Sequence, residues 1–161
     1  MGVAILIVDD NAQLRVFLRD IVHEAADLHV VGEAADGAEA MRLAQELRPD
    51  IMLLDLIMPR VNGLEVLQWI KAERPEIKAI IVTVHDEDAY RQAAEAGGAD
   101  AFLLKKTLGT VLLPTIQRLR GSLAPPQTSQ DNAQPGHGRQ PCCETSCALK
   151  TSTHADPHPP G

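Results

Sequence analysis

Five short apolar segments alternate with stretches of helical periodicity in the first 121 residues, and few folds accommodate that alternation. The apolar segments are rich in valine, isoleucine and leucine, and they occupy 3–8, 29–33, 51–54, 79–83 and 101–104. Strands that are apolar along their whole length, without polar alternation, are typical of a sheet buried on both faces. The strands therefore require a layer of helices on each side.

The gaps between the apolar segments carry apolar residues at the spacing of one helical face. The five stripes are, in chain order: Leu14, Phe17, Leu18, Ile21 and Val22; Ala40, Leu43, Ala44 and Leu47; Val66, Leu67 and Ile70; Ala89, Ala93 and Ala96; Leu108, Leu112, Ile116 and Leu119. We expect Gly97 or Gly98 to end the fourth helix in the left-handed conformation, and Pro114 to bend or shorten the fifth. Strands and helices in strict alternation predict a doubly wound α/β fold with a five-stranded parallel sheet.

Polar residues stand where four of the predicted strands end. Asp9 and Asp10 follow the first strand, Asp55 follows the third, Thr83 closes the fourth, and Lys105 closes the fifth. The carboxyl ends of parallel strands share one edge of the sheet, and such sheets bind ligands there, where the strand order reverses. One aspartate after a strand is most often a cap or turn residue. The joint pattern favours a binding site instead.

Three carboxylates in one crevice require a compensating positive charge. Mg²⁺ is a hard cation that binds through one or two carboxylates together with phosphate and water oxygens, and Mn²⁺ is the alternative ion. Lys105 adds an ammonium group and Thr83 a hydroxyl donor, so the crevice suits the oxygens of a phosphoryl group. Asp55 is then the candidate nucleophile that would carry an acyl phosphate.

The segments ILIVDDN, LLDLIMPRVNG, IIVTVHD and GGADAFLLKK, in this order and spacing, resemble the receiver domain of bacterial two-component response regulators over roughly residues 3–120. VVGEAADGAEA and FLLKK resemble the NarL/FixJ branch of that family. The resemblance implies a flavodoxin-like (βα)₅ fold with strand order 2-1-3-4-5. It also implies that Asp55 is the phosphoacceptor, and that Mg²⁺ is held by Asp9, Asp10, Asp55 and the backbone carbonyl of Ile57.

The resemblance also assigns residues to the switch. Thr83 and Lys105 match the hydroxyl and the lysine that bind the phosphoryl group, and Phe102 matches the aromatic residue that rotates on activation. Phenylalanine lacks the hydroxyl of the tyrosine found in many relatives, so we expect packing to drive the switch. Lys106 stands where many relatives have proline, whereas the loop MPRVNG keeps its glycine, Gly63.

The implied partners are a sensor histidine kinase or phosphotransfer protein as phosphodonor, and a downstream protein or a second copy of the chain as output. The formal net charge of −7 and the four aromatic residues argue against direct binding of nucleic acid. The sequence has no apolar run as long as a membrane span, and its N-terminus lacks the features of a secretion signal. We therefore expect a cytoplasmic signalling protein that is not an enzyme beyond self-phosphorylation and autodephosphorylation.

Composition changes after residue 121. Residues 122–161 contain seven of the eleven prolines, all three cysteines and no apolar periodicity, which predicts a disordered tail after a receiver domain at 1–121. Cys142, Cys143 and Cys147 lack the paired spacing of a zinc site. Three alternatives stay open: a stand-alone receiver, a truncated or frame-shifted DNA-binding transcriptional regulator, and a Mg²⁺-dependent phosphatase-like hydrolase.

Overall fold

A computed structural model describes residues 2–123, which form a five-stranded parallel sheet in the order β2-β1-β3-β4-β5. The strands are β1 (Val3–Val8), β2 (Leu28–Ala34), β3 (Ile51–Asp55), β4 (Lys78–Thr83) and β5 (Ala101–Leu104). The predicted strands and their order are thus confirmed. The order reverses at β1 and β3, which pair directly, so the crevice expected of this fold lies at their carboxyl ends.

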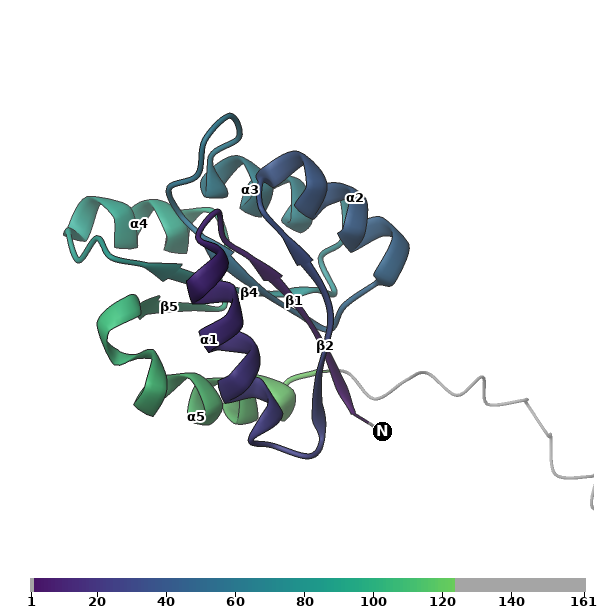
Figure 1. Cartoon of the computed structure of the whole chain (residues 1–161). Helices are drawn as coiled ribbons and strands as arrows, with labels where there is room; N and C mark the ends of the chain where they lie inside the picture. The colour runs from purple at the N-terminus through teal and green to yellow at the C-terminus, as the bar shows by residue number, and fades with distance from the viewer. Residues whose placement is uncertain (1, 124–161) are drawn as a thin grey trace, which may run out of the picture. The chain divides into compact units, whose positions relative to one another are not determined.

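Helices cover both faces of the sheet (Figure 1). They are α1 (Ala12–His23), α2 (Gly37–Leu47), α3 (Gly63–Glu73), α4 (Asp88–Ala96) and α5 (Leu108–Arg120), with a short 3-10 turn η1 (Lys105–Thr107) between β5 and α5. α1 and α5 pack on one face, and α2, α3 and α4 pack on the other. Neighbouring residues of β1 point into opposite cores: Leu6 and Val8 into one, Ile5 and Ile7 into the other. Burial on both faces explains why these strands are apolar throughout.

Side-chain caps fix the start of the helices that follow the first three strands. Asn11 accepts hydrogen bonds from the backbone of Gln13 and Leu14 at the start of α1, and Asn62 accepts one from Leu64 at the start of α3. At α2, Asp36 accepts from the Glu39 amide at 2.9 Å while the Glu39 carboxylate accepts from the Ala35 amide at 3.0 Å, a variant of the capping box in which Glu39 reaches the residue before the cap. Each cap stabilises its helix by about 1 kcal/mol. The loops at the carboxyl edge of the sheet are therefore anchored.

The structure settles two expectations about helix ends: the effect of Pro114 on α5 and the glycine that ends α4. Pro114 does not shorten the fifth helix, because α5 continues through it to Arg120. Proline has no backbone N–H, so the carbonyl of Thr110 loses its usual helical hydrogen bond. Thr110 and Pro114 are both exposed residues, so water can replace the missing donor. At the end of α4 the left-handed residue is Gly98, with φ of +86°, whereas Gly97 keeps a helical φ of −73°.

The predicted tail lies, from residue 124 on, outside the described residues. Within them, α5 is capped at Gly121, and Leu123 still packs against the core beneath α1 and α5. None of the helices in residues 2–123 is long and apolar enough to cross a membrane.

Candidate functional site

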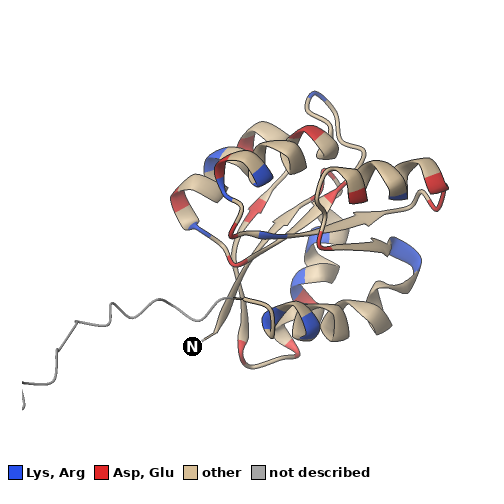
Figure 2. Ribbon diagram, turned by 180° about the vertical axis from the view of Figure 1, so that it is seen from behind, with Lys and Arg blue, Asp and Glu red and all other residues tan. Residues whose placement is uncertain are grey.

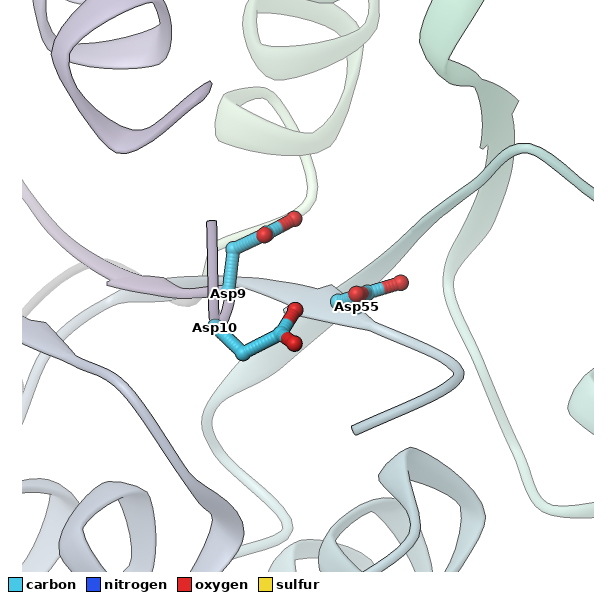
Figure 3. A group of neighbouring side chains, drawn as sticks. All are labelled: Asp9, Asp10 and Asp55. Atoms are coloured by element: carbon cyan, nitrogen blue, oxygen red, sulfur yellow. The ribbon is translucent and has the colours of Figure 1, made fainter. Parts of the chain in front are cut away.

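Asp9, Asp10 and Asp55 lie together at the carboxyl ends of β1 and β3 (Figure 3). One carboxylate oxygen of each lies within 4.8 Å of the others. The pairing of Val8 with Leu54 sets this geometry, because Asp9 and Asp55 are the next residues on two adjacent strands. Asp9 is 1% and Asp55 4% exposed, whereas Asp10 faces solvent. The structure thus brings the three predicted acids together in a half-buried cluster.

Lys105 supplies the positive charge nearest to this cluster. Its Nζ lies 2.8 Å from Asp9 Oδ2 and 3.2 Å from Asp55 Oδ2, and its side chain is 17% exposed. Burial alone would lower the pKa of Lys105, but the close contact with Asp9 and the charge of Asp55 outweigh it and raise the pKa. Lys105 is therefore an ammonium ion at neutral pH.

One ammonium group does not balance the three carboxylates. Burial and the neighbouring charge of Asp9 raise the pKa of Asp55 to about 6, against the opposing effects of Lys105 and of the Ile57 amide. The raised pKa means that the ionised form of Asp55 carries an unfavourable energy in the metal-free domain. A further cation would relieve it.

The cluster fits an oxygen-coordinated divalent cation. Asp9 Oδ2 is buried and faces the Lys105 ammonium at 2.8 Å, so its charge is met by an ion pair. Asp9 Oδ1, in contrast, accepts from the Asn11 amide at 2.8 Å. Ligand oxygens around octahedral Mg²⁺ stand about 3–4 Å apart, since each is about 2.1 Å from the metal. Oxygens within 4.8 Å reach that spacing with small side-chain movements.

The remaining predicted site residues lie on β4, on β5 and in the β3–α3 loop. Thr83 is fully buried at the end of β4, one residue beyond the partner of Asp55, and its Oγ1 accepts a hydrogen bond from the His85 amide at 3.1 Å. Ile57 donates its amide to Asp55 Oδ1 at 3.4 Å, and its carbonyl remains a predicted metal ligand. Phe102 pairs with Ile81 in the sheet and is partly buried.

Three residues that the sequence did not single out support the acid cluster. Arg15 on α1 donates from Nη1 to the backbone carbonyl of Asp9 at 2.7 Å and from Nε to Glu33 at 3.2 Å. Arg19 donates to the other oxygen of Glu33 at 2.9 Å. Glu33 on β2 therefore orients Arg15, and Arg15 fixes the backbone that carries Asp9.

The β3–α3 loop closes tightly against Asp55. A side chain at Gly63 would overlap with the carbonyl oxygen of Asp55, so this position accepts only glycine without backbone movement. Arg60 in the same loop adopts φ of +72° and pairs with Asp36 at 2.7 Å, which ties the loop to the start of α2. Further ion pairs lie on the outer surface, such as Arg42–Glu46 on α2 and Arg91–Asp86 at the start of α4. Figure 2 shows acidic and basic residues interspersed over the outer helices and loops.

Residues 5–117 match the family model of the response regulator receiver domain. The response regulator protein VraR of Staphylococcus aureus is 38% identical over 120 residues, a match that covers 73% of this chain and 56% of VraR. The chain thus spans little more than half the length of that relative.

Two solved structures share the fold. The response regulator domain of Thermotoga maritima CheB superposes with a TM-score of 0.71 at 33% identity, over 78% of this chain and 100% of that one. The receiver domain of NarL from Mycobacterium tuberculosis superposes with a TM-score of 0.71 at 29% identity, over 74% and 97% of the two chains. With the strand order and the acidic crevice described above, these matches show that the chain belongs to the response regulator receiver domain family of two-component systems.

Proposed function

We propose that this domain is a switch in which Asp55 accepts a phosphoryl group from a sensor histidine kinase or phosphotransfer protein in a Mg²⁺-dependent reaction. One observation carries the proposal. Asp55 is buried at the carboxyl edge of the sheet, 3.2 Å from the Lys105 ammonium and within 4.8 Å of carboxylate oxygens of Asp9 and Asp10. A nucleophile, a fixed cation and a set of metal ligands then face one phosphoryl group.

In the transfer step, a carboxylate oxygen of Asp55 attacks the phosphorus in line. A P–O bond forms, the P–N bond of the donor phosphohistidine breaks, and its electron pair leaves with the imidazole nitrogen. The pKa of Asp55, about 6, leaves the group mostly ionised at neutral pH, as a nucleophile must be. Asp9, Asp10 and the Ile57 carbonyl would hold Mg²⁺, which neutralises charge on the phosphoryl oxygens when bound.

Lys105 and Thr83 would bind the transferred group. The Lys105 ammonium already lies beside Asp55, so it donates to a phosphoryl oxygen after a small movement. The Thr83 oxygen accepts from the His85 amide, which leaves its own hydrogen available for a second phosphoryl oxygen. Movement of Thr83 towards that oxygen makes room for Phe102 and biases the domain towards the form that a downstream protein or a second copy recognises.

The proposal is tested by incubating the chain with acetyl phosphate and Mg²⁺ and measuring its intact mass. We expect one phosphoryl adduct on the wild type and on Asp20→Asn, an exposed aspartate of α1 that serves as the matched control. Asp55→Asn, and the wild type in excess chelator, should remain unmodified. Adduct formation by Asp55→Asn would refute the assignment, and steady release of phosphate without an adduct would favour a hydrolase.

A further inference from the structure

A cation lies over the ring of Phe102. The guanidinium carbon of Arg91, on α4, is 4.7 Å from the centroid of the Phe102 ring, on β5. The ring also packs against the core beneath α2, α3 and α4. Phe102 is thus held between apolar side chains and a guanidinium group, a cation–π contact that favours its present orientation.

The loop that follows Thr83 holds Arg91 in place. Asp86 lies in this loop, with Oδ1 3.3 Å from Arg91 Nη2 and Oδ2 3.6 Å from the Nζ of Lys106, the neighbour of Lys105. The His85 amide, next to Asp86, donates to the Thr83 hydroxyl oxygen at 3.1 Å. A continuous set of contacts therefore runs from Thr83 through the loop to Arg91.

We propose that the orientation of Phe102 in this structure is the resting one, and that Arg91 is a positioning residue that holds Phe102 in it and thereby sets how readily the domain switches. The inference rests on the proposed function, because it concerns the aromatic residue of that switch. A turn of Phe102 moves its ring away from the present position of the guanidinium group, so the contact stabilises the resting form. Movement of Thr83 towards a phosphoryl group displaces the loop and with it Asp86, which weakens the hold on Arg91.

The size of the effect follows from a two-state equilibrium. A ligand that binds only the switched form has an apparent affinity proportional to the population of that form. Cation–π contacts at partly exposed sites correspond to a factor of about two to five in an equilibrium constant. The side chain of Arg91 is 41% exposed, so this range applies, and removing the contact should raise the population of the switched form by that factor.

The chain contains two phenylalanines, Phe17 and Phe102, which makes ¹⁹F NMR of protein labelled with 4-fluorophenylalanine selective. Phe17 lies exposed on α1 and serves as the internal reference, and Phe102→Leu assigns the second resonance. The test variant is Arg91→Gln. The matched control is Arg42→Gln, which removes an exposed arginine of α2 whose ion-pair partner is Glu46. Each protein is titrated with beryllofluoride in the presence of Mg²⁺, as a mimic of the phosphoryl group.

In free Arg91→Gln we expect the Phe102 resonance to move towards its position in the beryllofluoride-bound wild type, and the affinity for beryllofluoride to rise about two- to fivefold. The Phe17 resonance and the Arg42→Gln control should match the wild type. If the wild type binds beryllofluoride and Arg91→Gln matches it in both affinity and Phe102 position, the role of Arg91 is refuted while the proposed function stands. A wild type that does not bind beryllofluoride would refute the proposed function, and the inference with it.

Discussion

Replacing the proposed phosphoacceptor should stabilise the metal-free domain. Asp55 is buried beside Asp9, and its pKa rises from 3.8 to about 6. Between these values the native state binds more protons than the unfolded state, so the stability of the wild type falls as the pH rises through this window. Asp55→Asn keeps the shape of the side chain but carries no charge, so its free energy of unfolding should not fall in this way as the pH rises.

The magnitude follows from the same shift. Each pKa unit corresponds to about 1.4 kcal/mol, so the rise from 3.8 to about 6 gives a stabilisation of Asp55→Asn of about 3 kcal/mol at pH 7.5. At pH 4.5 the Asp55 carboxyl of the native wild type is mostly protonated, so the expected stabilisation of Asp55→Asn relative to the wild type falls to about 1 kcal/mol. With a urea m-value of about 2 kcal/mol per molar, the midpoint should rise by about 1.5 M at pH 7.5 and by about 0.5 M at pH 4.5.

The assay is urea unfolding with a chelator present at both pH values. Asp20→Asn on the exposed side of α1 is the control, with an expected effect within about 0.5 kcal/mol. A destabilised Asp55→Asn at pH 7.5, or a difference that does not change between the two pH values, would refute the reasoning that charge burial at Asp55 opposes folding.

Three further predictions concern the metal, the loop and a remote ion pair. Mg²⁺ at about ten times its Kd should stabilise the wild type by about 1.4 kcal/mol, an effect that Asp10→Asn should reduce; equal stabilisation of both proteins would exclude Asp10 as a ligand. Gly63→Ala should lower the free energy of unfolding by about 1–3 kcal/mol and slow formation of the phosphoryl adduct, because the new methyl group overlaps with the Asp55 carbonyl. Normal stability and normal phosphorylation of this variant would show that the loop backbone moves without cost. Burial raises the pKa of Asp100, but hydrogen bonds from Lys71 and Ala79 outweigh burial and hold that pKa below 3.8. The stability that Asp100 contributes is therefore present above pH 3.8, and it is lost as the pH falls through the pKa of Asp100 in the folded state. Asp100→Asn should therefore unfold at lower urea than the wild type at pH 7 and lose that difference in acid.

Sequence alone could predict the parts of this protein that depend on topology. Buried parallel strands read as continuous apolar runs, and their carboxyl ends share one edge whatever the side-chain conformations are. For that reason the convergence of Asp9, Asp10, Asp55 and Lys105 followed from their positions after the strands. In the structure the three carboxylates lie within 4.8 Å of one another, and Lys105 contacts two of them, Asp9 and Asp55.

Contacts that depend on register and rotamer could not be predicted in this way. Arg15 and Glu33 are 18 residues apart and meet only because β1 pairs with β2, with a register shift between Ile5 and Leu6. The stacking of Arg91 on Phe102 requires a particular packing of α4 beside β5, and neither residue type signals it. The choice between Gly97 and Gly98 likewise depends on one hydrogen-bond pattern at the end of α4, which the two adjacent glycines leave undetermined.

Borohydride reduction converts an aspartyl phosphate into homoserine, so it locates the phosphoryl group chemically. After treatment with acetyl phosphate and Mg²⁺, reduction and peptide mass mapping should find homoserine at position 55 alone, and chelation of the metal should abolish it. Homoserine at a different aspartate, or full conversion with the metal removed, would contradict the assignment of Asp55, Lys105 and the neighbouring acids to one metal-dependent site.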